Sequence, residues 1–227
     1  MTARSSFDAV LFDCDGVLVD SEALGLDASA DYLRGHGLDW STADLVRIFT
    51  GLRDDVFAER LTAAYREKHA ADPADGFFQG LVDARRSLAH LLTEVAGARA
   101  AIEATPVAKA VASSSRAAVL EKKLKRTELW ALFEPHVYSA EVVDHGKPAP
   151  DIFLHAAEML DADPARCLVL EDSVNGVKAG VAAGMTVWGF TGGGHCFDGH
   201  GERLIDAGAE RVSASFDDYR NALGLGG

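Results

Sequence analysis

Cysteine is scarce in this chain. Its 227 residues include three cysteines, Cys14, Cys167 and Cys196, and no two of them form a Cys-x-x-Cys pair. An odd number of isolated cysteines argues against a disulfide framework and is typical of free thiols in a reducing compartment. We therefore expect a cytoplasmic location. Cys14 lies between two aspartates and is expected to point into the core, away from both of them.

Basic residues are also in short supply. Lysine and arginine number 22 against 35 aspartate and glutamate residues, which gives a formal net charge of −13 at pH 7. Proteins that bind nucleic acid neutralise its phosphates with lysine and arginine, so this charge argues against a nucleic-acid partner.

Long apolar runs, internal repeats and low-complexity tracts are absent from the sequence. The apolar run near the N-terminus, Phe7–Phe12, is far shorter than the roughly 20 residues that span a bilayer and too short for a secretory signal. We expect no membrane partner and no signal segment. Hydrophobic residues make up 48% and charged residues 25% of the chain, which is typical of a folded globular protein.

The sequence does contain short buried strands that alternate with helices. Each expected strand ends abruptly at polar or glycine residues. These strands are Phe7–Phe12, Val107–Ala112, Cys167–Leu170 and Thr186–Phe190. Apolar residues recur at helical spacing in Asp151–Leu160, and Ser173 is the expected N-cap of a helix that ends at Gly184. This alternation predicts an α/β fold, a Rossmann-like parallel sheet with helices on both faces.

A helical segment interrupts this pattern. About ninety residues separate Asp13 from the second strand, whereas a β-α-β crossover needs a helix of about a dozen residues. The expected helices are Ala23–Leu33, Asp44–Phe49, Arg53–His69 and Phe77–Leu92. We therefore expect a core domain of residues 1–19 and 93–227 and an inserted α-helical cap domain of residues 20–92. The cap could hinge over the edge where the strands end.

Reactive side chains follow the expected strands. Ligands of an open α/β sheet bind beyond the carboxyl ends of its strands. The residues gathered at that edge are Asp13, Asp15, Ser113, Ser114, Arg116, Lys147, Glu171 and Asp172. Carboxylates at neighbouring strand ends repel one another unless a cation lies among them. Because the donors are oxygens, without histidine or cysteine, they favour Mg²⁺.

The spacing of two aspartates indicates a reaction. Aspartate can attack phosphorus and form an aspartyl phosphate, while a magnesium ion and Lys147 neutralise charge on the transferring oxygens. We expect Asp13 to be the nucleophile. Asp15, two residues further on, can protonate the leaving oxygen and later take a proton from the attacking water.

Four short segments resemble the motifs of a known superfamily, and they occur in the same order. They are Asp13-Cys-Asp-Gly-Val17, Ser113, Lys147 within Gly-Lys-Pro-Ala-Pro-Asp151, and Glu171-Asp172-Ser173. Together they resemble the motifs of the haloacid dehalogenase superfamily of phosphohydrolases. The helical insertion resembles the small cap of the branch that contains phosphoglycolate phosphatases, sugar-phosphate phosphatases and β-phosphoglucomutase.

The resemblance implies a role for each matching residue. Asp13 would be the nucleophile and Asp15 the acid and base, while Ser113 and Lys147 would hold the phosphate. The Mg²⁺ ligands would be Asp13, Asp15 through its carbonyl oxygen, Asp172, and Glu171 directly or through water. The substrate would be a small phosphorylated metabolite, either a sugar phosphate or a phosphorylated sugar acid.

The residues at two positions, 15 and 25, indicate which reaction of the superfamily to expect. Dehalogenases of the superfamily lack an aspartate at the position of Asp15, so dehalogenation is not expected. In β-phosphoglucomutase a histidine stands five residues after the aspartate that matches Asp20, and this chain has Gly25 there. We therefore expect an enzyme, a phosphatase. A β-phosphoglucomutase-like phosphomutase and a non-catalytic protein that binds a phosphorylated metabolite are the alternatives.

Other polar residues have both structural and functional interpretations. Ser113 is expected to cap the following helix as well as hold phosphate, and Ser114 and Arg116 are candidates for substrate contacts. Arg53, at the start of a cap helix, is a candidate for holding a carboxylate or hydroxyls of the substrate. The basic residues expected on the solvent-exposed face of the helix after Ser113 are Lys122, Lys123, Lys125 and Arg126.

The segment Gly192–His200 has two interpretations. Its residues His195, Cys196 and His200 suggest a zinc site. The glycine-rich setting and the lack of a fourth ligand favour a mobile loop that flanks the site. For the whole chain we expect a monomer or a weak homodimer.

Overall fold

The computed structural model describes residues 7–49 and 54–225. The chain divides into two compact units, Met1–Asp20 with Thr93–Gly227 and Ser21–Leu92, which we call the core unit and the helical unit. The chain leaves and re-enters the core unit at neighbouring points, because the Asp20 N–H donates a 3.1 Å hydrogen bond to the Thr93 carbonyl oxygen. The Asp20 carboxylate accepts a 3.0 Å hydrogen bond from the Gly194 N–H.

The core unit is built on a parallel sheet. Within the described residues, its six strands run in the order β3-β2-β1-β4-β5-β6, and each neighbouring pair is parallel. The strands are β1 (Ala9–Phe12), β2 (Ala108–Ser113), β3 (Val137–Ser139), β4 (Cys167–Glu171), β5 (Thr186–Phe190) and β6 (Arg211–Ser213). The predicted Rossmann-like α/β fold is confirmed.

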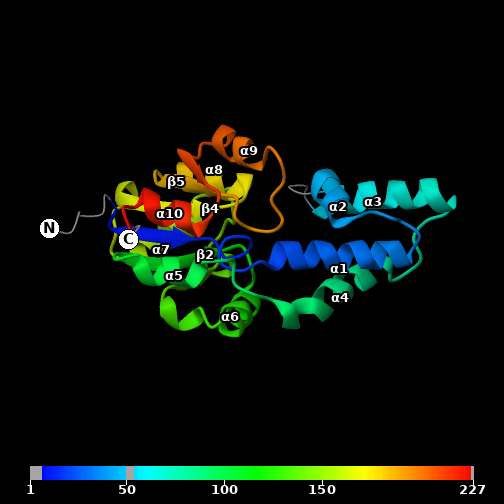
Figure 1. The fold of residues 1–227 in the computed structure, drawn as a ribbon, viewed down its shortest axis with the longest axis horizontal. Helices are drawn as coiled ribbons and strands as arrows, with labels where there is room; N and C mark the ends of the chain where they lie inside the picture. Colours follow the sequence, from blue (N-terminus) through cyan, green and yellow to red (C-terminus); the bar gives the residue numbers. More distant parts are fainter. Residues whose placement is uncertain (1–6, 50–53, 226–227) are drawn as a thin grey trace. The chain divides into compact units, whose positions relative to one another are not determined.

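Helices cover both faces of this sheet (Figure 1). The helices of the core unit are α5 (Ala98–Ala104), α6 (Ala117–Arg126), α7 (Asp151–Met159), α8 (Val174–Ala182), α9 (His200–Asp206) and α10 (Phe216–Ala222). Short 3-10 turns are η2 (Trp130–Leu132), η3 (Ala140–Val142) and η4 (Pro164–Arg166). α7, α8 and α9 pack on one face, and α5 and α10 pack together on the other.

β1 lies in the middle of the sheet, and both of its faces are buried. Leu11 packs in an apolar cluster with Ile152 and Phe153 of α7, whereas the ring of Phe12 lies 5.9 Å from the ring of Tyr219 on α10. A parallel strand that is covered on both faces is apolar at successive positions. This is why a continuous apolar run, and not an alternating pattern, marks β1 in the sequence.

The strand order reverses between β1 and β4. From β1 the chain continues outward to β2 and β3 in one direction, and from β4 it continues to β5 and β6 in the other. Ligands of such sheets bind in the crevice outside the carboxyl ends of the strands at the point of reversal. The residues that directly follow β1 and β4 are therefore the first place to look for a site.

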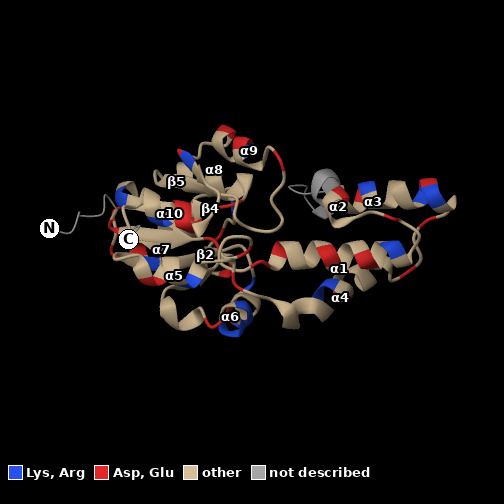
Figure 2. Ribbon diagram, viewed as in Figure 1, with Lys and Arg blue, Asp and Glu red and all other residues tan. Residues whose placement is uncertain are grey.

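The helical unit has an apolar core of its own. Its elements are α1 (Ser21–Gly35), α2 (Thr42–Phe49), α3 (Asp54–His69), α4 (Phe77–Ser87) and η1 (Leu88–Leu91). Leu33 of α1, Leu61 of α3 and Leu81 of α4 are buried in one cluster. Acidic residues lie along α1, whereas basic residues gather on α6 of the core unit (Figure 2). None of the helices in the described part of the chain has the length and apolar character that a membrane crossing requires.

One helix begins later than the sequence predicts. The prediction that Ser113 caps the helix after the second strand is wrong, because Ser113 is the last residue of β2 and pairs with Ser139 of β3. α6 begins at Ala117, with Arg116 at its N-cap. The edge strands β3 and β6 were not predicted, and each is too short to give an apolar run in the sequence.

Candidate active site at the carboxyl edge of the sheet

Three carboxylates meet where β1 and β4 end. Asp13 directly follows β1, and its N–H donates a 3.0 Å hydrogen bond to the Leu170 carbonyl oxygen of β4. Glu171 is the last residue of β4, and Asp172 comes next. All three acidic side chains are buried, with ligand oxygens that all lie within 4.8 Å of one another. The parallel register thus brings together acidic residues from two distant parts of the chain.

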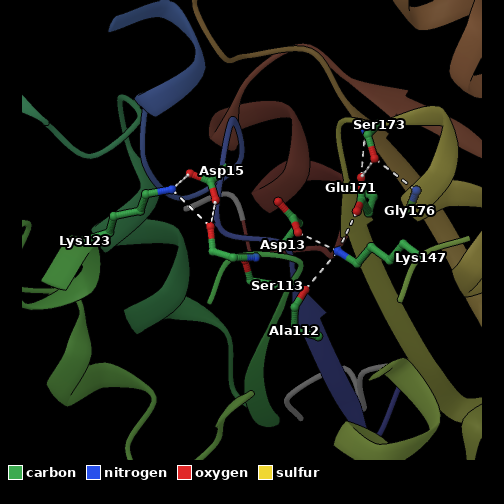
Figure 3. A network of polar contacts seen from close by, with 10 residues as sticks. Asp13, Asp15, Ala112, Ser113, Lys123, Lys147, Glu171, Ser173 and Gly176 are labelled. Carbon is green, nitrogen blue, oxygen red and sulfur yellow. Dashed lines mark hydrogen bonds and ion pairs between the residues drawn. The ribbon is translucent and has the colours of Figure 1, made fainter. Parts of the chain in front are cut away.

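Lys147 reaches into this cluster from the loop before α7 (Figure 3). Its Nζ lies 2.5 Å from Asp13 Oδ1 and 2.8 Å from Glu171 Oε1, and it donates a 3.0 Å hydrogen bond to the Ala112 carbonyl oxygen. The ammonium group also lies 4.8 Å from the centre of the Phe153 ring. Since its side chain is only 4% exposed, Lys147 is a buried cation within the cluster.

Burial and neighbouring charges set the protonation of these groups. Burial raises the pKa of Asp13 well above its usual value; Lys147 opposes this shift, and Glu171 and Asp172 add to it. Burial alone would lower the pKa of Lys147, but Asp13 and Glu171 raise it above its ordinary value. Three carboxylates around one ammonium group leave excess negative charge in a buried space. A divalent cation that prefers carboxylate oxygens, such as Mg²⁺, fits this donor set.

Two glycines make room for the carboxylates. A Cβ on Gly16 would lie 2.0 Å from Asp172 Oδ2, and a Cβ on Gly176 would lie 1.6 Å from Glu171 Oε1. The N–H and the hydroxyl of Ser173 donate hydrogen bonds of 2.7 Å and 2.9 Å to Glu171 Oε2. Ser173 Oγ accepts a 3.0 Å hydrogen bond from the Gly176 N–H, which confirms Ser173 as the N-cap of α8.

A second polar network holds Asp15 (Figure 3). The Ser115 hydroxyl donates a 2.7 Å hydrogen bond to Asp15 Oδ2. The ammonium group of Lys123 pairs with Asp15 Oδ1 and donates a 3.2 Å hydrogen bond to Ser115 Oγ. The prediction that Lys123 lies on the solvent-exposed face of its helix is therefore wrong. Its position directly before the buried Leu124 and one turn after the buried Leu120 is the signal that could have identified it.

The other predicted substrate residues differ in their placement. Ser113 is buried at the end of β2, where its hydroxyl accepts a 3.1 Å hydrogen bond from the Ser115 N–H. Ser114 and Arg116 are exposed on the loop between β2 and α6. Arg53 lies outside the described residues. The Ser113 hydroxyl thus contacts the main chain of Ser115, and the Ser115 hydroxyl contacts Asp15.

Two histidines that the sequence analysis placed on a loop flanking the site are buried against Asp172. His195 Nε2 lies 2.8 Å from Asp172 Oδ2, and His200 Nε2 lies 2.6 Å from the Asp172 carbonyl oxygen. Burial alone would lower the pKa of His195, but its hydrogen bond to Asp172 raises it to about 11. Burial lowers the pKa of His200. Both histidines follow β5, the strand next to β4, and this position is the signal that could have identified them.

Comparison with known proteins identifies the family to which this chain is similar. The family model of haloacid dehalogenase-like hydrolases matches residues 7–184. The chain is 31% identical over 207 residues to the phosphorylated carbohydrates phosphatase of Thermotoga maritima, a match that covers 89% of this chain and 92% of that protein. It is 34% identical over 178 residues to the bifunctional riboflavin kinase/FMN phosphatase of Arabidopsis thaliana. The second match covers 78% of this chain, which spans only 47% of that relative.

A solved structure extends the similarity to the whole fold. The structure is that of a haloacid dehalogenase family hydrolase from Deinococcus radiodurans R1 with bound phosphate and sodium. It is 35% identical to this chain, with a TM-score of 0.86, and the superposition covers 97% of this chain and 98% of the other. The family model covers the site residues from Asp13 to Gly176, and the structural similarity extends over 97% of the chain.

Proposed function

This chain belongs to the haloacid dehalogenase-like hydrolase family and is a phosphatase, and we propose that it hydrolyses small phosphorylated sugars or sugar acids with Mg²⁺. The reaction passes through an aspartyl phosphate on Asp13. The observation that carries this proposal is the buried cluster in which Asp13 lies 2.5 Å from the Lys147 ammonium group and beside Glu171 and Asp172. A relative named for phosphorylated carbohydrates supports the substrate class.

The side chains of Asp13 and Asp172 and the carbonyl oxygen of Asp15 would hold the magnesium ion, with Glu171 contacting it directly or through water. When bound, the ion neutralises negative charge on the phosphoryl oxygens. With a cation held there, Asp13 would be ionised more readily, although burial and the neighbouring carboxylates raise its pKa. The ionised form is needed because a protonated carboxyl group is a poor nucleophile.

Asp13 makes the covalent bond in the first step. Its carboxylate oxygen attacks phosphorus, and the bond from phosphorus to the leaving oxygen breaks. Asp15, in its protonated form, gives its proton to that oxygen, so the product leaves as an alcohol. The Ser113 hydroxyl and the Lys147 ammonium group donate hydrogen bonds to the phosphoryl oxygens. All three N–H donors of Lys147 are engaged in this structure, so one of them changes acceptor when phosphate binds.

Hydrolysis of the aspartyl phosphate regenerates Asp13. Asp15, now a carboxylate, takes a proton from a water molecule whose oxygen attacks phosphorus, and the bond between phosphorus and Asp13 breaks. Inorganic phosphate is then released. Because one carboxyl group serves both steps, its side chain has to stay in one place. The 2.7 Å hydrogen bond from Ser115 and the ion pair with Lys123 meet this requirement.

The sequence of α1 argues against the phosphomutase, and the pair of aspartates after β1 argues against a protein that only binds its ligand. A phosphomutase needs a group that activates a sugar hydroxyl, and α1, which is described over its whole length, has Gly25 and no histidine. A protein that only binds a phosphorylated metabolite has no need of a nucleophile and an acid two residues apart, as Asp13 and Asp15 are.

A phosphate-release screen tests the proposal. With Mg²⁺ present, the protein is expected to release phosphate from sugar phosphates and phosphorylated sugar acids faster than from FMN or nucleotides. EDTA is expected to stop the release. Asp13→Asn should abolish both turnover and the phosphorylated peptide that mass spectrometry detects after an acid quench of the wild type. Phosphate release that persists in EDTA, or in Asp13→Asn, would overturn the proposed chemistry, and transfer within a sugar bisphosphate without release would indicate a mutase.

A further inference from the structure

The loop that joins β5 to α9 lies against the turn that follows Asp13. A Cβ on Gly193 would lie 2.5 Å from the Gly16 carbonyl oxygen and 2.9 Å from His195 Cε1. Gly16 has a φ of +80°, and a Cβ there would lie 2.6 Å from His195 Cε1. Backbones approach this closely only where glycine removes the side chain. The two glycines therefore let the imidazole of His195 enter the edge of the sheet beside the carboxylates.

Two imidazoles contact Asp172, one at its side chain and the other at its main chain. His195 Nε2 lies 2.8 Å from Oδ2 of the side chain, and His200 Nε2 lies 2.6 Å from the carbonyl oxygen. His195 is 4% and His200 7% exposed, and the two rings pack edge to face with centroids 5.7 Å apart. Because both rings are buried and in contact, they fix the main chain and the side chain of Asp172 together.

The proton on His200 can be placed from its surroundings. Its Nδ1 is buried and has no hydrogen-bond partner among the described residues, so an N–H at that atom would be unsatisfied. The Asp172 carbonyl oxygen can only accept, which requires the N–H to be on Nε2. His200 therefore donates to the main chain of Asp172. His195 donates to the Asp172 carboxylate in the same way, because that group is also an acceptor when ionised.

We propose that His195 is a positioning residue that orients the Asp172 carboxylate toward a divalent cation, with His200 fixing the main chain of the same residue. This inference rests on the proposed metal-dependent function. Groups that hydrogen-bond to metal ligands orient those ligands, and their loss typically lowers metal affinity by about 10–100-fold. The proposal gives a role to two residues outside the four segments that resemble superfamily motifs.

A separate metal site on the same histidines is the competing explanation. Ligand atoms of His195, Cys196 and His200 lie within 4.8 Å of one another. The positioning role is favoured because the Nε2 atom of each imidazole already contacts Asp172. Cys196 Sγ lies 3.8 Å from the same Nε2 atom of His195, so a thiolate site using that atom would break the contact with Asp172.

Binding of Mg²⁺ to the substrate-free protein tests this role. Calorimetric titration with Mg²⁺ alone gives the affinities of the wild type and of His195→Gln, His195→Asn and Cys196→Ser. The amide nitrogen of glutamine reaches about as far as Nε2 of histidine, whereas that of asparagine stops near Nδ1. We expect His195→Asn to weaken Mg²⁺ binding by about 10–100-fold and His195→Gln to restore most of it. Cys196→Ser should bind like the wild type.

The outcomes separate this inference from the proposed function. If the wild type binds Mg²⁺ and releases phosphate while His195→Asn binds Mg²⁺ equally well, the positioning role is overturned and the proposed function stands. If Cys196→Ser loses binding as fully as His195→Asn, a thiolate site replaces the positioning role. A wild type that releases phosphate without binding Mg²⁺ would overturn both. If circular dichroism in EDTA shows that His195→Asn is unfolded, His195→Met, which keeps bulk without a donor, carries the same expectation.

Discussion

The Lys147 ammonium group balances part of the charge of Asp13 and Glu171, so two substitutions in this cluster should change stability in opposite directions. Asp13→Asn removes one carboxylate and leaves Lys147 paired with Glu171. We expect the metal-free protein to become more stable, because burial and the neighbouring carboxylates both disfavour the ionised form of Asp13. Lys147→Met leaves the carboxylates without their cation and should lose about 3–5 kcal/mol. Urea unfolding in EDTA measures both, and equal losses in the two variants would contradict this account.

The raised pKa of Asp13 also predicts how stability depends on pH. A carboxyl group with a higher pKa in the folded state keeps a proton that the unfolded chain releases. Above the usual aspartate value of about 3.9, the stability of the metal-free protein should therefore fall as pH rises toward the folded pKa of Asp13. Asp13→Asn should flatten this part of the curve. Urea unfolding in EDTA at several pH values measures the slope, and an unchanged slope in the variant would count against the assignment.

Lys123 is expected to act on the rate through Asp15. Lys123→Met removes the ion pair with Asp15 and keeps the hydrogen bond that the Ser115 hydroxyl donates to it. We expect kcat to fall about tenfold, as for the partial loss of a general acid and base, with little change in KM or in circular dichroism. Lys122→Met is the matched control, because Lys122 is exposed and adjacent on the same helix. An equal loss of kcat in the two variants would show that Lys123 has no particular role.

Some site residues were predictable from the sequence and others were not, for a physical reason. Asp13 and Asp172 each follow a buried apolar run, and a parallel sheet brings such positions to one edge. The prediction that Cys14 points into the core is confirmed, since it is buried and free. The contact of Lys123 with Asp15 joins residues 108 positions apart. Local patterns place Lys123 beside buried leucines and His195 after a neighbouring strand, but they do not identify Asp15 and Asp172 as the residues that these side chains contact.

At the scale of single elements, the Glu171 carboxylate leaves room only for glycine at position 176, in the first turn of α8. An alanine at Gly176 would place its Cβ on the Glu171 carboxylate, which would have to leave Lys147. We expect Gly176→Ala to cost about 1–3 kcal/mol through overpacking and to slow phosphate release. Gly25→Ala in α1 is the control, because that position is helical and its Cβ would meet nothing within 4 Å.

The two glycine variants are compared by urea unfolding and by phosphate release. Gly25→Ala should gain about 0.5–1 kcal/mol, since alanine restricts the unfolded chain more than glycine does. A stabilised Gly176→Ala protein with normal activity would show that Glu171 can move without consequence.

The elements themselves were predicted to different degrees. β1 is a continuous apolar run in the sequence because helices cover both of its faces. The start of α6 could not be predicted, because its first turn has no side-chain cap from its own segment. Instead the Ala117 N–H donates a 2.9 Å hydrogen bond to Glu141 Oε2, from a residue in η3. A cap supplied by a distant residue leaves no signature near the helix.

At the scale of the whole molecule, the charge of −13 repels the substrates that the site is proposed to bind. Repulsion between a negative protein and a negative ligand weakens as salt screens it. We therefore expect kcat/KM to rise by about twofold or more between low and physiological ionic strength. The rise should be steeper for a phosphorylated sugar acid, which carries a carboxylate as well as the phosphate, than for a sugar phosphate of similar size without the carboxylate. A fall in kcat/KM with added salt would show that local attraction at the site outweighs the net charge.

The hydrogen bond between Asp20 and Gly194 connects the point where the chain leaves the core unit with the loop that holds Asp172. Asp20 lies where the chain leaves the core unit, and Gly194 directly precedes His195, which holds Asp172. Thermodynamic linkage makes any coupling between such points reciprocal. If a cation bound at the carboxylate cluster changes the affinity for substrate through the main chain at Asp20, then bound substrate changes the affinity for the cation by the same factor. Ion binding and substrate binding would then change each other's affinity by one common factor, and the hydrogen bond from the Gly194 N–H to Asp20 would carry that coupling.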